Sequence, residues 1–162
     1  MTFHEIADTL YTTPISTWIR ETAGIIPTTQ SVHILAIAVV VGSALVTDLR
    51  LAGVLAIDET PRTVVRRYLP WMWAALAVLL ATGAIMAVGE PNRVLTNPLF
   101  WTKMVLVVLA FCLTLLFRYP FLHPQFQVQH PRWAGLAKPV AWVSLLVWIG
   151  VIFCGRWIAY AI

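Results

Sequence analysis

One stretch of the chain, residues 31–57, constrains the fold more than any other. It reads SVHILAIAVVVGSALVTDLRLAGVLAI, and a helix needs only about 20 predominantly apolar residues to cross a bilayer core. Its ionisable side chains are His33 near the start and Asp48 and Arg50 near the end. At about 1.5 Å per residue, His33 and Asp48 are about 22 Å apart along a helix, so we expect them on opposite sides of the membrane.

The composition of the whole chain is that of an integral membrane protein in a lipid bilayer. Of its 162 residues, 60% are hydrophobic and 11% are charged, which is outside the range of soluble globular domains. The net charge is +4, but the basic residues are spread over short connections, so no nucleic-acid partner is expected. The first 30 residues lack a basic start followed by an apolar core, so no cleavable signal peptide is predicted.

Three further apolar runs predict an all-α integral membrane fold with four transmembrane helices in an up-down bundle. The predicted spans are residues 31–57, 68–88, 99–117 and 140–160, within a transmembrane domain of residues 31–162. Prolines are concentrated between the spans, and we interpret the connections around residues 58–67 and 118–139 as loops. Small residues recur at helical spacing in the second span, at Ala74, Ala77, Ala81 and Ala84. They predict a close-packing surface.

Residues 1–30 are predicted to be an N-terminal interfacial segment. Pro14 occupies a plausible helix start, and Ile15, Trp18 and Ile19 follow on roughly one face, which is typical of an amphipathic helix lying at the membrane surface. We expect Pro27 to end this element. Thr28, Thr29 or Ser31 can then cap the first span.

The distribution of Lys and Arg predicts the orientation. The connections after the first and third spans, with their flanks, hold seven basic residues, whereas the opposite side holds four. Basic residues favour cytoplasmic loops, so we expect both termini in the periplasm of a bacterium, with the protein in its inner membrane.

Polar residues inside the spans fall into two groups. The outer half holds an imidazole, two thioethers and two cations, at His33, Met86, Met104, Lys103 and Arg156. Imidazole and thioether are common axial ligands of haem iron, and basic side chains suit haem carboxylates. The purely structural alternatives are a histidine that hydrogen-bonds a neighbouring helix, methionines that fill gaps and basic residues that contact headgroups.

The inner half holds Asp48, Arg50 and Arg118, which we expect to form a structural ion pair, since an unpaired charge in hydrocarbon is costly.

The four segments VHILAIAVVVGSALVTDLRL, LPWMWAALAVLLATGAIM, NPLFWTKMVLVVLAF and SLLVWIGVIFCGRWIAY resemble an uncharacterised family of small four-helix bacterial inner-membrane proteins. More distantly, a histidine that opens span one, an arginine 17 residues later and a Trp-x-Lys that opens span three are similar to the haem-containing membrane protoporphyrinogen oxidase family. The matching positions are His33, Arg50, Trp101 and Lys103. The resemblance implies that His33 binds haem b. Span one also resembles the copper-resistance D family.

Three hypotheses follow, none of which identifies catalytic residues. The first is a haem b protein in electron transfer or oxidoreduction, with His33 as the metal ligand and Met86 or Met104 as a sixth ligand. The second is a non-catalytic subunit or scaffold that forms a homo-oligomer or binds a membrane partner complex. The third is copper or small-solute handling, for which the chain offers few soft ligands. Departures at Phe117 and Arg118 from the oxidase pattern argue against oxidase activity itself.

Overall fold

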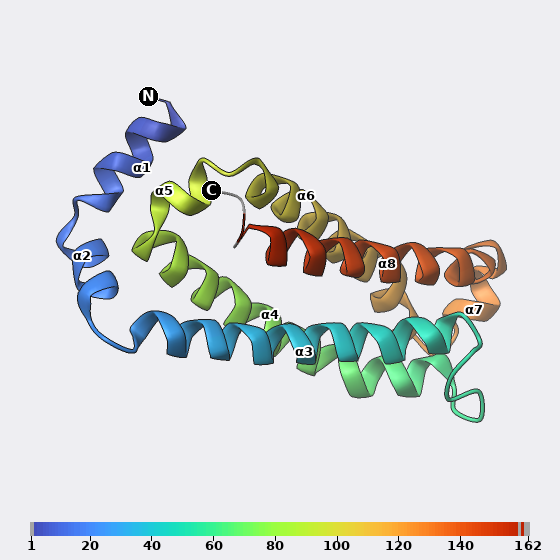
Figure 1. The fold of residues 1–162 in the computed structure, drawn as a ribbon. Coiled ribbons are helices and arrows are strands. Elements are labelled where there is room, and N and C mark those ends of the chain that lie inside the picture. The colour runs from blue at the N-terminus through green and yellow to red at the C-terminus, as the bar shows by residue number, and fades with distance from the viewer. Residues whose placement is uncertain (1, 159, 161–162) are drawn as a thin grey trace.

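The computed structural model describes residues 2–158 and 160, and every regular element in that part of the chain is helical (Figure 1). The long helices are α3 (Ile25–Leu51), α4 (Pro61–Gly89), α6 (Pro98–Leu113) and α8 (Pro131–Trp157), and the short ones are α1 (Phe3–Tyr11), α2 (Pro14–Glu21), α5 (Pro91–Leu95) and α7 (Phe126–Gln129). A π turn, η1 (Thr114–Arg118), and a 3-10 turn, η2 (Tyr119–Leu122), continue α6. Together these make four helices that are long and apolar enough to cross a membrane, which confirms the predicted fold class.

The long helices are arranged in the order α4, α3, α8, α6. The pairs that pack along their lengths are α3 with α4, α3 with α8, and α6 with α8. The helices at the two ends of this row, α4 and α6, meet through the rings of Trp73 and Phe111, whose centroids are 5.2 Å apart. The turn η2 also packs on α4. The bundle is therefore closed between α4 and α6 by large side chains and by η2.

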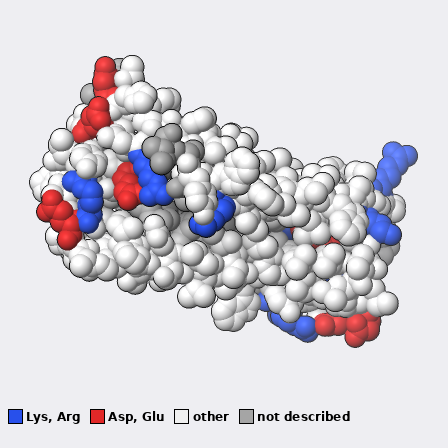
Figure 2. All heavy atoms as spheres, in the orientation of Figure 1, with Lys and Arg blue, Asp and Glu red and all other residues white. Residues whose placement is uncertain are grey.

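The two ends of the bundle differ in what covers them. We call one the terminus end, because α1, α2 and α5 lie there and α8 finishes there, and the other the loop end, where η2, α7 and the α3–α4 connection lie (Figure 1). On the face drawn in Figure 2, charged side chains gather toward these two ends and the stretch between them is mostly uncharged. This is the charge distribution that a bilayer requires of a protein that crosses it.

The helices begin earlier than the sequence predicted because prolines start them instead of breaking loops. Pro61 and Pro131 are the first residues of α4 and α8, a position where the missing N–H has no helical partner to lose. Residues 58–67 and 118–139 therefore contain helix where loops were expected. Pro70 and Pro139 lie inside their helices.

The first span differs from its predicted bounds at both ends. It begins at Ile25, after Gly24 with φ of 94°, and ends at Leu51. Glycine adopts this left-handed conformation without the steric cost that a side chain adds. Pro27 lies in the first turn of α3 and does not end the preceding element, and no side-chain cap precedes α3. The expectation that Thr28, Thr29 or Ser31 caps the span was wrong.

The predicted helix after Pro14 is α2, and it packs on α4. It buries Ser16 and Ile19 and leaves Ile15 and Trp18 more than 60% exposed. A Cβ added at Gly89, the last residue of α4, would lie 2.9 Å from Ile19 Cγ2, so the absence of a side chain there allows the close approach. The location of α2 at a membrane surface stays a prediction.

The small-residue stripe of the second span does not pack inside the molecule. All four of its alanines are exposed, and the buried positions of α4 in this region are Met72, Ala75 and Thr82. The stripe therefore faces the surroundings of the bundle.

Candidate functional site

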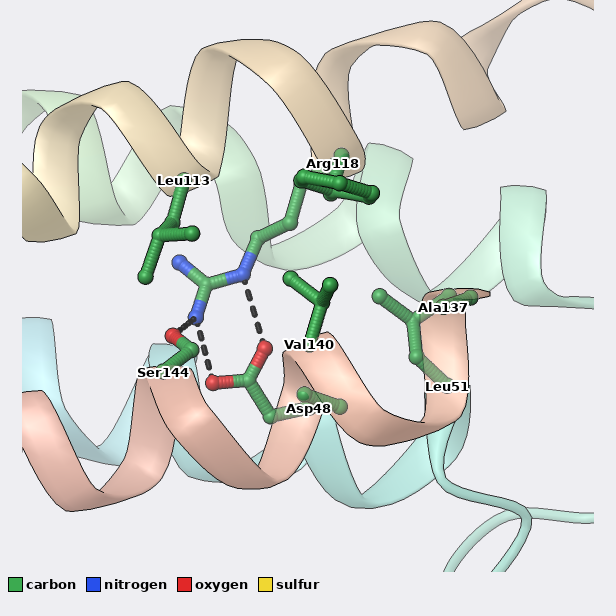
Figure 3. Close-up of a pocket in the computed structure, with 9 residues that line it drawn as sticks. Asp48, Leu51, Leu113, Arg118, Ala137, Val140 and Ser144 are labelled. Carbon is green, nitrogen blue, oxygen red and sulfur yellow. Dashed lines mark hydrogen bonds and ion pairs between the residues drawn. The ribbon is translucent and has the colours of Figure 1, made fainter. Parts of the chain in front are cut away.

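A buried ion pair joins the long helices toward the loop end. Arg118, in the π turn η1, donates from Nε to Asp48 Oδ1 at 3.0 Å and from one terminal nitrogen to Oδ2 at 2.6 Å. Figure 3 shows the two side chains facing each other between their helices. Both are about 2% exposed. Of the three residues predicted for this pair, the structure brings together Asp48 and Arg118.

The remaining N–H groups of the Arg118 guanidinium also have acceptors, in α4, α8 and η1 itself. The same terminal nitrogen donates to Ser144 Oγ of α8 at 2.9 Å (Figure 3). The other donates to Thr114 Oγ1 at 2.9 Å and to Met72 Sδ of α4 at 3.1 Å. A guanidinium carries five N–H donors, and this geometry gives each an acceptor. We call Asp48, Met72, Thr114, Arg118 and Ser144 the Arg118 cluster.

The Arg118 cluster is enclosed. The cavity beside it has a volume of about 10 Å³, and a cavity needs about 10–15 Å³ to hold one water molecule. There is no room for an organic ligand. A cluster with all its polar groups satisfied and so little free space stabilises the fold, because removing either charge leaves the other unpaired in hydrocarbon.

Arg50 lies apart from this cluster. Its Nε donates to the backbone carbonyl of Glu59 at 2.7 Å, so it ties the end of α3 to the connection that leads to α4. The Glu59 carboxylate in turn pairs with Arg67 on the exposed surface. Arg50 thus belongs to the loop end and not to the buried pair.

His33 faces the neighbouring helix α4 in the terminus half of the bundle. Its Nδ1 is 2.7 Å from Thr82 Oγ1, and a Cβ added at Gly83 would lie 3.8 Å from its Cε1. The Thr82 hydroxyl is also 2.7 Å from the Val78 carbonyl oxygen. Because that carbonyl can only accept, the hydroxyl proton points to it, and His33 Nδ1–H donates to Thr82 Oγ1. In the neutral ring the lone pair is then on Nε2.

Lys103 of α6 lies in the same half of the bundle as His33. Its Nζ would be 3.5 Å from a Cβ added at Gly155, so the side chain lies across α8 where that helix lacks a side chain. The ammonium is close enough to His33 to interact with it through space. In the described part of the chain, Lys103 has no hydrogen bond or ion pair. We call His33, Thr82 and Lys103 the His33 site.

Of the other predicted members of the outer-half group, one is exposed and two are half-buried. Arg156 is exposed, and its guanidinium lies 4.8 Å from the ring centroid of Tyr160. Met86 and Met104 are half-buried. Among the described residues, no group of three or more His, Cys, Asp or Glu side chains could hold a metal ion.

Trp148 of α8 has a buried polar atom without a partner. It is 4% exposed, and its Nε1 is the one buried side-chain nitrogen or oxygen in the described residues that lacks a hydrogen-bond partner. Ser144 of the Arg118 cluster lies four residues before it, and Gly155 beside Lys103 lies seven residues after it. The indole therefore lies on the core face of α8, between the Arg118 cluster and the His33 site.

A family model matches residues 3–161 of the chain and is described as a family of unknown function (DUF6644). The chain belongs to this family. No curated protein and no solved structure matches. Membership in DUF6644 agrees with the predicted likeness to an uncharacterised family and assigns no activity, so the chemistry of the two polar groups has to be argued from their geometry.

Several residues of these groups escaped the sequence prediction. Thr82, Thr114, Ser144 and Met72 were not among the predicted site residues. Only for Ser144 could the sequence have indicated a buried position. It lies at helical spacing from Ala137, Ala141 and Val151, which are buried on the same face of α8. The partner of each of the others depends on how separate helices pack.

Proposed function

We propose that the protein is a membrane haem b protein that transfers electrons, with the His33 site holding the haem. The observation that carries the proposal is the His33–Thr82 hydrogen bond of 2.7 Å. Histidines that bind a metal through one ring nitrogen nearly always donate a hydrogen bond from the other, which fixes the tautomer and the ring orientation. His33 makes such a hydrogen bond through Nδ1, and its Nε2 has no hydrogen-bond partner among the described residues.

The charge near His33 supports the same proposal. Lys103 is a half-buried cation with no anionic partner in the described residues, and a haem carboxylate would supply one. When bound, haem supplies one-electron redox chemistry. His33 would bind the iron, Thr82 would orient the imidazole and Lys103 would hold a carboxylate. Met86 or Met104 would complete the iron's ligands.

Absorption spectroscopy tests the haem proposal. The protein purified from haem-replete cells is expected to show a Soret band that is lost or shifted in His33→Ala. Arg156→Ala is the matched control, because it removes an exposed basic residue of the same half of the bundle. A colourless wild-type protein from such cells would refute the proposal.

We also propose that the bundle self-associates through the alanine stripe of α4. All four alanines are exposed, and small residues let helices approach closely in a bilayer, where van der Waals packing drives association. Ala81→Leu is expected to lower the dimer fraction measured by energy transfer between labelled copies in vesicles. Ala38→Leu, on an exposed position of α3, is the control. Equal dimer fractions in the two variants would exclude this interface.

For orientation, we propose that the loop end faces the cytoplasm of a bacterium and that the protein lies in the inner membrane. The loop half holds seven of the eleven basic residues and three of the seven acids, and this excess follows the bias of Lys and Arg toward cytoplasmic loops. A reporter that is active only in the periplasm is expected to work when fused after residue 162 and to be silent when fused within the α3–α4 connection. The reverse result would invert the topology.

A further inference from the structure

An open groove lies at the loop end of the bundle, where α7 is found (Figure 1). Its volume is about 360 Å³, which is within the range of about 300–1,000 Å³ that small-molecule sites occupy. The polar residues that line it are all exposed, so a ligand can reach them directly. We call it the loop-end groove, and it is lined by His123, Pro124, Gln125, Phe126, Gln129 and His130.

The loop-end groove lies at the depth of the lipid headgroups. Its residues form the connection between two segments that are long and apolar enough to cross a membrane, Pro98–Leu122 and Pro131–Trp157. The headgroup layer adds about 5–8 Å to each side of the hydrocarbon core. Because a short connection between two span ends stays close to that core, the groove opens where headgroups are found.

The polar lining favours a ligand that accepts hydrogen bonds. The side-chain amide of Gln129 donates to Gln125 Oε1 at 3.0 Å, so this oxygen is already engaged. The Gln125 amide then has two N–H donors for a ligand and the Gln129 amide has one, while each imidazole of His123 and His130 carries at least one N–H. Donors therefore outnumber acceptors in the groove.

The charge around the groove is positive. Residues 91–162 contain six Lys and Arg and no Asp or Glu. Arg62 of α4 donates from Nε to the Leu122 carbonyl oxygen at 2.8 Å, which holds its guanidinium beside the start of the groove. Among the described residues, its terminal nitrogens have no hydrogen-bond partner. Arg132 is exposed two residues after His130. Two imidazoles flanked by guanidinium groups, without a carboxylate in the lining, suit an anion such as a phosphate and not a metal cation.

Exposed apolar side chains continue from the groove. Val128 of α7 is 83% exposed. Trp133 of α8 is 48% exposed, and its ring centroid lies 5.6 Å from that of Phe117 in η1. Tryptophan at the end of a membrane span is typical of contact with lipid. A ligand that carries both a phosphate and acyl chains would cover the polar and the apolar surface together, whereas a free phosphate would leave the apolar one uncovered.

We propose that the loop-end groove binds the headgroup of an anionic phospholipid. The phosphate oxygens accept hydrogen bonds from Arg62 and from the amides and imidazoles of the groove, and the acyl chains lie against Trp133. The proposal concerns one defined lipid site and is independent of haem binding at His33.

Native mass spectrometry tests the proposal by counting the lipids that stay bound. The protein is released from micelles that contain equal amounts of phosphatidylglycerol and phosphatidylcholine with the same acyl chains, and it is expected to retain phosphatidylglycerol preferentially. Arg62→Gln is expected to lower the ratio of the two bound lipids about five-fold, the contribution of one basic residue near an anionic surface. Arg67→Gln is the matched control, because it removes the same charge at the same end but from a guanidinium already paired with Glu59.

The imidazoles give a second readout. Protein labelled with ¹⁵N-histidine is placed in phosphatidylcholine nanodiscs, and His123→Ala and His130→Ala identify the two signals by their disappearance. Phosphatidylglycerol in the nanodiscs is expected to move both signals in the wild type and in Arg67→Gln, and to move them less in Arg62→Gln. Both variants experience the same membrane surface potential, so the difference between them reports direct binding. Inorganic phosphate is expected to leave the signals in place.

Three results would overturn the proposal. The first is equal retention of the two lipids by the wild type, and the second is an equal ratio of bound lipids in Arg62→Gln and Arg67→Gln. The third is a movement of the histidine signals with inorganic phosphate as large as that with phosphatidylglycerol, which would make the ligand a free anion. All the substituted side chains are exposed, so the variants keep the fold.

Discussion

The Arg118 cluster makes a sharp prediction about stability. In Arg118→Met, the Asp48 carboxylate stays buried but loses both hydrogen bonds from the guanidinium. Breaking a buried pair in this way costs about 3–5 kcal/mol, because an uncompensated charge remains. The double variant Asp48→Leu with Arg118→Met removes both charges, and replacing a buried pair with apolar residues is often neutral. We therefore expect the double variant to recover most of the loss.

The exposed pair of the loop end supplies the control. Arg67 and Glu59 share two hydrogen bonds of 2.8 and 3.0 Å, a geometry as favourable as that of Asp48 and Arg118, but their side chains are 53% and 31% exposed. Solvent screening makes such a pair contribute little to stability. Unfolding by SDS in mixed micelles, followed by circular dichroism, measures both free energies. The reasoning is refuted if Arg118→Met is no more destabilising than Arg67→Ala, or if the double variant is less stable than the single one.

Three further substitutions test the contacts at the terminus end. Thr82→Val removes the acceptor of the His33 ring, and loss of such a support typically lowers metal affinity about 10–100-fold, which titration of haem into the apoprotein measures; wild-type affinity would contradict the assigned tautomer. Gly155→Leu is expected to displace the neighbouring lysine and lower the Soret absorbance per protein, whereas Gly42→Leu, built into open space, leaves it unchanged. Gly89→Ala puts a Cβ 2.9 Å from the nearest α2 atom and should cost about 1–3 kcal/mol by overpacking; a thermal midpoint equal to that of Gly42→Ala would argue against this contact.

The sequence predicted the fold class because length and apolarity decide whether a helix crosses a bilayer. The predicted helix starts were misplaced because a proline can either break a helix or begin one. Only the capping geometry distinguishes the two cases. At Pro61 the preceding Thr60 accepts a hydrogen bond from the Thr63 N–H and begins a helix. At Pro27 the chain had already turned at Gly24.

The partners of the polar residues could likewise be predicted only in part from the sequence. Asp48 and Arg118 are separated by 70 residues, and their pairing was expected because neither charge is tolerated alone at that depth. The same reasoning predicted that Arg50 would join the pair. Its helix face and its place near the end of α3 direct it instead to the Glu59 carbonyl. The partners Thr82 and Ser144 depend on which helices are neighbours, and the order α4, α3, α8, α6 is not encoded in any single segment.

The long sequence separation within the Arg118 cluster has a consequence for biogenesis. During synthesis at about 5–20 residues per second, the 70 residues from Asp48 to Arg118 take roughly 4–14 s to emerge. For that time the first span has an acid with no counterion, and its stable residence in lipid must await the third. We therefore expect assembly of this small protein to be ordered by charge, with α3 and α4 held beside the insertion machinery until Arg118 has been made.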